Sequence, residues 1–223
     1  MNKITQAEFN ALPIVDGIKH CPANRDYSDI RSFGERCSFG EGCSFGERCS
    51  FGEWCSFGER CSFGKVCSFG KGCSFGKGCS FGKVCSFGEG CSFGEWCSFG
   101  ERCSFGKVCS FGNGCSFGEW CSFGERCSFG ERCSFGERCL FENRGIAKDQ
   151  YSVISFGYFG SRNDTTYAFN LDTGISVRCG CWIGTLSEFR EQIVNTHANN
   201  QNAKIYLAIA DLIELRFSEQ ETK

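Results

Sequence analysis

The sequence predicts a mainly β protein in which a parallel β solenoid is followed by a small α+β domain. Three observations support this prediction. A six-residue word, written SFGERC from Ser32, occurs eighteen times in succession with Phe, Gly and Cys unchanged. The composition changes sharply at both ends of this repeat. The segment after the repeat contains alternating apolar patterns and a helix-capping signal instead of further words.

The sequence divides into three predicted parts. Residues 1–31 form an N-terminal cap of one short helix and a lead-in strand, residues 32–145 form the repeat, and residues 146–223 form the α+β domain. Thr5-Gln6-Ala7-Glu8 is a capping box, which predicts a helix that ends before Pro13. The end strands of a solenoid have unpaired backbone N–H and C=O groups that can pair with another chain. We therefore expect both flanks to cap the repeat.

The word itself predicts one short strand and one corner. Phe and Cys lie two positions apart across the boundary between words, as in Cys37, Ser38 and Phe39. In an extended segment they point to one face, while Ser points to the other. Gly supplies a turn, and the two variable residues face outward. A unit this small cannot bury its own Phe, so it must stack on copies of itself.

The pattern Phe-Gly-x-x-Cys-Ser resembles the hexapeptide repeat of left-handed β-helices. The resemblance covers about half of the chain. It implies a left-handed triangular coil of three words, and therefore about six coils. The sequence departs from that family by using Phe where an aliphatic residue is usual. A four-sided coil, similar to that of pentapeptide-repeat proteins, is the alternative, and the charged columns fit both registers equally well.

Cysteine is abundant, with 21 residues, of which eighteen occupy one fixed place in the word. We interpret these as small apolar fillers between phenylalanines, because they face inward and no word contains His. A thiol array for metal binding or redox sensing is the alternative. Cys179 and Cys181 share one face of a predicted strand and are weak metal candidates, although packing against the final helix is favoured. No cofactor is expected.

The C-terminal segment predicts a three-stranded meander and two helices. Strands are expected over Tyr151–Phe159, Thr166–Leu171 and Ile175–Trp182, with a turn at residues 172–174. A second capping box, residues 185–188, begins the first helix. The final helix carries Ile205, Ile209 and Leu212 on one face.

Charge and hydropathy limit the class of ligand and the cellular location that we expect. The net charge of −2 lies in the C-terminal part, and no part has a basic excess, which argues against nucleic acid as a direct ligand. The N-terminus lacks an apolar segment of signal-peptide length, and no apolar run reaches the roughly 20 residues that span a membrane. We therefore expect a cytoplasmic protein, in the cytosol of a bacterial host, without membrane contact.

The two variable residues of each word are expected to face solvent, and they are the positions at which one word differs from another. Trp54, Trp96 and Trp120 lie among arginines at these positions, and such a composition is enriched at protein interfaces. Together with Arg162 and Trp182 of the C-terminal domain, they are the candidate residues for binding a protein partner. A solvated surface with weak ion pairs is the alternative. In a three-word register the three Trp residues fall in different columns.

The repeat followed by TTYAFNLDTGISVRCGCWIGTLSEF resembles uncharacterised repeat proteins of bacteriophages and bacterial mobile elements. That resemblance implies a small rigid protein that acts on a host or phage macromolecule. We expect a non-catalytic binding protein, in concrete form an inhibitor of a host defence system, similar to an anti-CRISPR. The alternatives are an enzyme resembling hexapeptide-repeat acyltransferases, although no word supplies a His base, and a self-associating structural protein or homo-oligomer.

Overall fold

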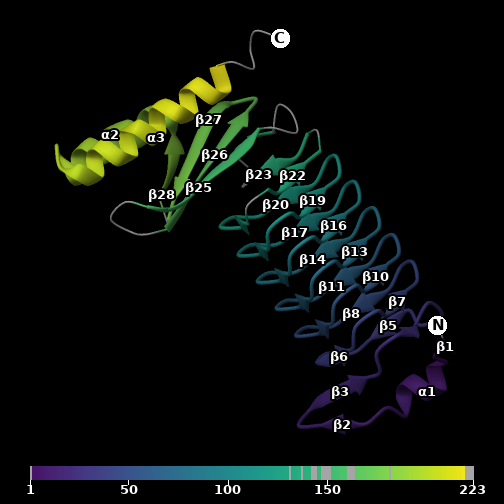
Figure 1. The fold of residues 1–223 in the computed structure, drawn as a ribbon. Helices are drawn as coiled ribbons and strands as arrows, with labels where there is room; N and C mark the ends of the chain where they lie inside the picture. Colours follow the sequence, from purple (N-terminus) through teal and green to yellow (C-terminus); the bar gives the residue numbers. More distant parts are fainter. Residues whose placement is uncertain are drawn as a thin grey trace. The chain divides into compact units, whose positions relative to one another are not determined.

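The computed structural model describes residues 2–130, 132–136, 138–141, 145–146, 152–159, 164–180 and 182–218. The chain divides into two compact units, Met1–Asn143 and Arg144–Lys223. The first is a parallel β solenoid of about seven turns, and the second combines an antiparallel sheet with two helices (Figure 1). Among the described residues, no helix has the length and apolar character needed to cross a membrane.

Three sheets form the sides of the solenoid, and we number them by the order in which the repeat visits them. Their strands are parallel except for one antiparallel pair in the N-terminal segment, between Ile14–Val15 and Ile18–Lys19. Sheet one contains β5 (Ser32–Phe33), β8 (Ser50–Phe51), β11 (Ser68–Phe69), β14 (Ser86–Phe87), β17 (Ser104–Phe105), β20 (Ser122–Phe123) and β23 (Leu140–Phe141). Sheet two contains β2 (Ile14–Val15), β3 (Ile18–Cys21), β6 (Cys37–Phe39), β9 (Ser56–Phe57), β12 (Ser74–Phe75), β15 (Ser92–Phe93), β18 (Ser110–Phe111) and β21 (Ser128–Phe129). Sheet three contains β1 (Asn2–Lys3), β4 (Arg25–Asp26), β7 (Ser44–Phe45), β10 (Ser62–Phe63), β13 (Ser80–Phe81), β16 (Ser98–Phe99), β19 (Ser116–Phe117) and β22 (Ser134–Phe135).

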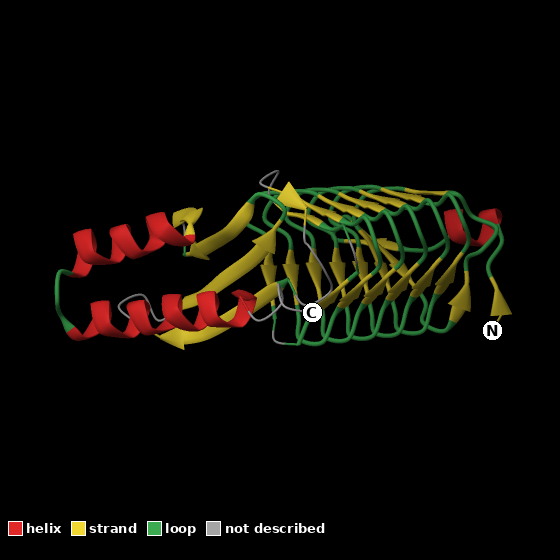
Figure 2. Ribbon diagram, turned by 90° about the horizontal axis from the view of Figure 1, so that it is seen from above, coloured by secondary structure: helices red, strands yellow, loops and turns green. Residues whose placement is uncertain are grey.

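The register decides between a three-sided and a four-sided coil. Ser62 of β10 pairs with Ser80 of β13, and Phe63 pairs with Phe81, so each strand stacks on the strand three words earlier. The triangular coil is therefore confirmed, and the four-sided alternative does not apply. Strands from the N-terminal segment extend sheets two and three beyond the repeat, which adds to the six coils that the words supply (Figure 2).

The core consists of stacked phenylalanine rings. Phe69 lies parallel to Phe87 of the next coil, with ring centroids 4.8 Å apart. It meets Phe75 of the neighbouring sheet edge to face, at 5.0 Å and an angle of 87°. Offset-stacked and edge-to-face arrangements are the favourable geometries for aromatic pairs. A triangular prism therefore accommodates Phe in place of an aliphatic residue because every ring finds both kinds of partner.

The N-terminal segment closes one end of this core. Helix α1 (Gln6–Asn10) begins at the predicted capping box, and its Phe9 packs edge to face on Phe33 at 5.2 Å. Tyr27 takes the place of a Phe in sheet three and stacks on Phe45 at 5.3 Å. Lys19 donates from Nζ to the carbonyl oxygen of Phe9, 3.1 Å away. The expected cap is thus built from aromatic residues that continue the core.

The second unit is an antiparallel meander with two helices. Its elements are β24 (Gly145–Ile146), β25 (Val153–Phe159), β26 (Asp164–Leu171), β27 (Gly174–Cys179), β28 (Trp182–Thr185), α2 (Leu186–His197) and α3 (Gln201–Ser218). The sheet order is β25-β26-β27-β28. The sequence predicts one strand over residues 175–182, whereas the chain turns at Gly180, which has φ 62°. Trp182 consequently starts a separate fourth strand.

Helices α2 and α3 cover one face of this sheet (Figure 1). Thr185 caps α2 through its side chain, as the sequence predicts. Phe189 and Ile193 of α2 and Ile213 of α3 are buried in a common core with Val177 of β27. Arg190 bridges the helices, with its guanidinium 2.6 Å from Asp211 and 2.7 Å from Glu214.

Candidate functional site

The solenoid displays its variable residues along three edges, which we number after the sheet that precedes each corner. In most described words the second variable residue lies in the left-handed region, as Arg60 does with φ 56°. Backbone hydrogen bonds continue from coil to coil through the corner, for example from Arg36 N to Glu53 O at 2.9 Å. The variable side chains therefore form ordered columns at the spacing of stacked strands, about 4.8 Å.

The glycine of each word has a different role from the turn residue that the sequence suggests. A Cβ atom built on Gly70 would lie 2.7 Å from the backbone nitrogen of Glu53 in the previous coil. At Gly34, in the first coil of the repeat, no atom lies within 4 Å of such a Cβ. Glycine is therefore required by the close approach of successive corners.

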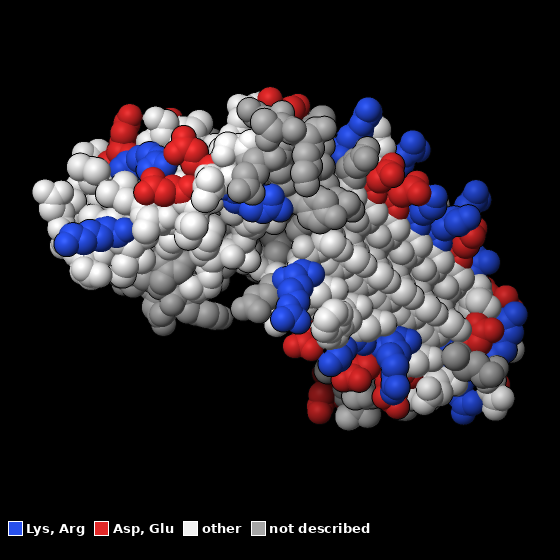
Figure 3. Space-filling model, turned by 45° about the horizontal axis from the view of Figure 1, so that its top comes forward, with Lys and Arg blue, Asp and Glu red and all other residues white. Residues whose placement is uncertain are grey.

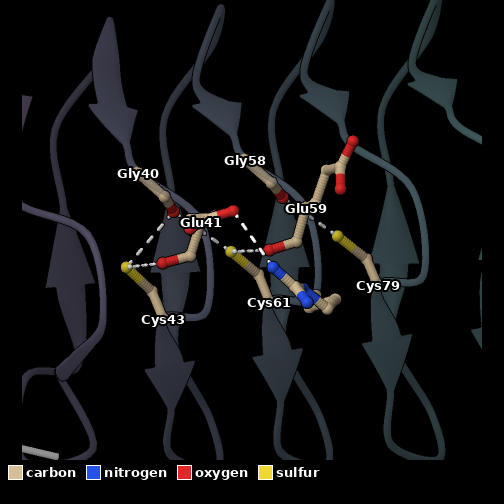
Figure 4. Close-up of polar contacts among 8 residues, drawn as sticks. Gly40, Glu41, Cys43, Gly58, Glu59, Cys61 and Cys79 are labelled. Carbon is tan, nitrogen blue, oxygen red and sulfur yellow. Dashed lines mark hydrogen bonds and ion pairs between the residues drawn. The ribbon is translucent and has the colours of Figure 1, made fainter.

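The cysteines lie inside these corners. Cys61 donates its thiol hydrogen to the carbonyl oxygen of Gly40 in the previous coil, at 3.4 Å, and Cys79 does the same toward Gly58 at 3.3 Å (Figure 4). The hydrogen bond with Cys121 and burial raise the pKa of the Cys103 thiol to about 12, whereas hydrogen bonds with Cys43 and Cys79 lower the pKa of the Cys61 thiol. The described cysteines of the repeat are buried, apart from the half-buried Cys133, and buried structural thiols of this kind are inert. This geometry supports the interpretation of the cysteines as packing residues.

Ion pairs join residues that are 18 apart in the chain, one coil apart in space. Lys83 lies 2.6 Å from Glu101, and Lys107 lies 3.0 Å from Glu125. Their side chains are about half exposed, so each pair contributes only about 0–1 kcal/mol. Figure 3 shows charged side chains gathered along the edges, with a face of uncharged residues between them.

The three predicted tryptophan anchors lie on three different edges. Trp54 is on the first edge, Trp96 on the second and Trp120 on the third, and their exposed fractions are 61%, 54% and 45%. Trp54 lies against Gly72 of the next coil, and Trp96 lies against Gly114. The guanidinium of Arg138 lies over the Trp120 ring at 4.7 Å. The structure therefore exposes these side chains without bringing them together.

The third edge differs from the other two in having a side chain at every second variable position. Glycine interrupts the first edge at Gly72 and Gly90, and the second edge at three positions. The third edge has no such gap, and its column reads Arg48, Val66, Val84, Arg102, Trp120 and Arg138.

Val108 on the first edge has φ 58° and is 49% exposed. Two valines of this kind, Val66 and Val84, lie in succession on the third edge, and the sequence reasoning did not single them out. They have φ values of 62° and 63°, a conformation that β-branched residues rarely adopt. Both remain about half exposed, so packing does not account for their presence. The signal in the sequence is the glycine found at the same position in five other words, which indicates a left-handed backbone there.

The remaining predicted residues belong to the second unit. Trp182 and Cys179 line one pocket of about 90 Å³, together with residues of α2 and α3. Arg162 and Cys181 lie outside the described residues. Within the described part of the chain, no group of three or more His, Cys, Asp or Glu residues is arranged to hold a metal ion.

Comparison with protein families gives one match. The model of the RNA-binding, Nab2-type zinc finger matches residues 31–46, 37–58, 48–64, 78–94 and 120–141, which together make up less than half of the chain. No curated protein and no solved structure matches the chain. The family match points to nucleic acid, so the prediction against nucleic acid as a direct ligand is wrong. That prediction uses the net charge of whole segments. A net charge does not reveal local combinations of a cation and an aromatic ring, such as Arg138 over Trp120.

The matched segments do not fit a zinc ion in this structure. Zinc takes thiolate, imidazole or carboxylate ligands in a tetrahedral arrangement. The matched cysteines are instead spaced along the solenoid, and Cys43, Cys49 and Cys61 each donate a thiol hydrogen bond to a backbone carbonyl. None of the matched segments contains His. The likeness therefore concerns the spacing of cysteines, without a zinc-binding geometry.

Proposed function

We propose that this protein is a non-catalytic binding protein whose rigid solenoid presents its third edge to a protein partner. The observation that carries the proposal is the uninterrupted column from Arg48 to Arg138, with Val66 and Val84 at its centre. A left-handed backbone costs a non-glycine residue about 1–2 kcal/mol. Residues retained in such a conformation without burial are candidates for function.

The chemistry of the third edge favours a partner surface that is apolar and carries charges of both signs, because Glu47, Glu101 and Glu119 lie at the same corners as its arginines and its tryptophan. Val66, Val84 and Trp120 offer exposed apolar area in one column, whereas the first edge offers Trp54 and Val108 and the second offers Trp96. Arg48, Arg102 and Arg138 interleave with this area. Aromatic residues and arginine are enriched at the energetically important positions of protein interfaces.

The continuous hydrogen-bonded stack supports a rigid presentation of this edge. A column fixed at the strand spacing loses little conformational freedom on binding, which favours affinity. In the finer form of the proposal, the partner is a component of a bacterial defence system and the protein acts as its inhibitor. The support for that form is the resemblance of the chain to phage and mobile-element repeat proteins.

The test uses two matched double variants. Val84→Gly with Trp120→Gly alters the third edge, and Val108→Gly with Trp54→Gly makes the same changes on the first edge. All four positions have φ near 60°, so glycine fits the backbone at each of them. Each tagged protein is used to capture partners from bacterial and phage-infected lysates, and affinity is then measured with the purified partner.

We expect a stoichiometric partner whose affinity falls at least tenfold with the third-edge variant and stays within twofold with the first-edge variant, roughly the effect of one truncated anchor. Equal effects of the two variants would remove the third edge as the site. Failure of the wild-type protein to capture any stoichiometric partner would argue against the function itself.

RNA binding is the second candidate function, and the family match favours it. The guanidinium of Arg138 lies over the ring of Trp120. Proteins that bind single-stranded nucleic acids combine such groups, because bases stack on aromatic rings and cations contact the phosphate backbone. Fluorescence anisotropy with a labelled single-stranded RNA tests this candidate. Binding that weakens with salt and is lost in Trp120→Gly would support it. Absence of binding at low salt would exclude it.

A further inference from the structure

The second unit contains a pocket whose location is independent of the solenoid edges. It lies at the end of β27 and the start of β28, against the C-terminal half of α2 and the adjacent part of α3. Its volume is about 90 Å³. It is lined by Cys179, Trp182, Phe189, Gln192, Ile193, Thr196, His197 and Tyr206.

Four of the lining residues form a connected series of rings. Trp182 lies 5.5 Å from Phe189, and Phe189 meets Tyr206 edge to face at 6.3 Å. Tyr206 in turn stacks on His197 at 5.5 Å, with an angle of 14° between the rings. Phe189, Ile193 and Tyr206 are buried in the core of the unit, so the inner wall of the pocket is fixed by packing.

Three polar residues of the pocket come from the C-terminal half of α2. Gln192 and Thr196 are exposed on α2, and the Gln192 amide donates to the Thr196 hydroxyl at 2.9 Å. His197 lies one residue further and is half-buried. Among the described lining residues there is no Asp, Glu, Lys or Arg. A charged ligand would lose hydration there without gaining a counter-charge.

We propose that this pocket binds a neutral aromatic ring that carries one hydrogen-bonding group, such as a phenol or an indole. Aromatic walls favour stacked and edge-to-face contacts with such a ring, and the side chains of Gln192, Thr196 and His197 can hydrogen-bond its substituent. This ring is either a free small molecule or the side chain of a Tyr or Trp in a peptide. The inference goes beyond the proposed function, because it involves none of the residues of the third edge.

The experiment titrates p-cresol, the side chain of tyrosine, into ¹⁵N-labelled full-length protein and follows amide shifts by NMR. Two matched variants on α2 complete the design. Thr196→Trp places an indole in the pocket, whereas Val194→Trp places it on an exposed part of the same helix outside the lining. Both positions are exposed, so each variant is expected to keep the amide dispersion of the folded unit.

We expect shifts confined to residues around the pocket, with a dissociation constant on the order of 1 mM, as for a fragment of this size. Thr196→Trp should weaken binding at least tenfold and Val194→Trp less than twofold. N-acetyl-tyrosine amide that binds more tightly than p-cresol would identify a peptide as the source of the ring, and the reverse order would identify a free small molecule. Absence of shifts at the pocket up to the solubility limit, or equal effects of both variants, would overturn the proposal.

Discussion

The indole of Trp54 lies against Gly72, the residue at the equivalent corner one coil further along the first edge. A Cβ atom on Gly72 would lie 2.4 Å from two carbons of that ring, and the same relationship joins Trp96 to Gly114 at 2.5 Å. The variable positions of successive coils are therefore coupled. The ring of a tryptophan occupies the space that a Cβ atom would need at the equivalent position of the next coil, so that position is glycine in two cases. In the third case it is Arg138, whose guanidinium lies over the ring of Trp120.

This coupling predicts a measurable interaction between Trp54 and position 72. Gly72→Ala should destabilise the solenoid by about 1–2 kcal/mol through its left-handed backbone alone, and by about 1 kcal/mol more because the indole must move. Gly90→Ala is the control, since Gly90 has φ 70° with no atom within 4 Å of a Cβ. A double-mutant cycle with Trp54→Ala, measured by urea unfolding, should remove the difference. A cycle with no coupling energy would refute the relationship.

A second prediction concerns the glycine that follows each phenylalanine. Gly70→Ala should lower the free energy of unfolding by about 3 kcal/mol or more, because its Cβ would press on the backbone of the previous coil. Gly34→Ala makes the same change where nothing lies within 4 Å, and should stay within about 0.5 kcal/mol of the wild type. Urea unfolding followed by circular dichroism gives both values. Equal effects at the two positions would show that turn conformation, and not coil contact, selects glycine.

Comparison of the sequence with the structure shows which features a periodic pattern can predict. The period of two across Cys37, Ser38 and Phe39 is enough to assign inward and outward residues. The short length of the word predicts that coils stack on one another, because one word cannot bury its own Phe. The choice of three sides needs the pairing of Ser62 with Ser80, which the ambiguous charge columns do not supply. Local periodicity reports one strand, whereas the number of sides depends on contacts between coils.

The candidate sites show the same limit. The exposure of Trp54 and its two counterparts follows from their variable positions, and the sequence places them in separate columns. The left-handed backbone of Val66 depends on corner geometry, which only the glycines at equivalent positions suggest. The pocket beside Trp182 depends on the turn at Gly180 and on helices that lie later in the chain. No local pattern predicts such a tertiary arrangement.

The left-handed backbone of Val66 and Val84 gives a third prediction. Substitution by glycine usually destabilises a protein, whereas here we expect it to stabilise the fold. Val84→Gly should raise the free energy of unfolding by about 0.5–1 kcal/mol, because relief of the left-handed conformation exceeds the added entropy of the unfolded chain. Val84→Ala retains a Cβ and should gain less. Chemical unfolding of the three proteins measures the order. A less stable Val84→Gly would mean that the exposed valine stabilises the fold and is not retained for binding.

The last prediction is that the solenoid loses stability in alkaline solution through the buried thiol of Cys103. The pKa of Cys103 rises from 9.0 to about 12 because of the hydrogen bond with Cys121 and burial. The unfolded chain therefore releases this proton at lower pH than the folded chain. The stabilisation is complete below about pH 9 and is lost as the pH rises from about 9 toward 12, with a slope of up to about 1.4 kcal/mol per pH unit for each such thiol.

Urea unfolding under reducing conditions, followed by circular dichroism between neutral pH and about pH 11, measures this slope. Cys103→Ala should reduce it by up to the equivalent of one proton, which separates the thiol from lysines and tyrosines that titrate in the same range. An unfolding midpoint that stays constant across pH 9–11, or an unchanged slope in Cys103→Ala, would mean that the thiols ionise as readily in the solenoid as in the unfolded chain. Cys103 would then ionise like an accessible thiol, and its interpretation as an inert packing residue would be wrong.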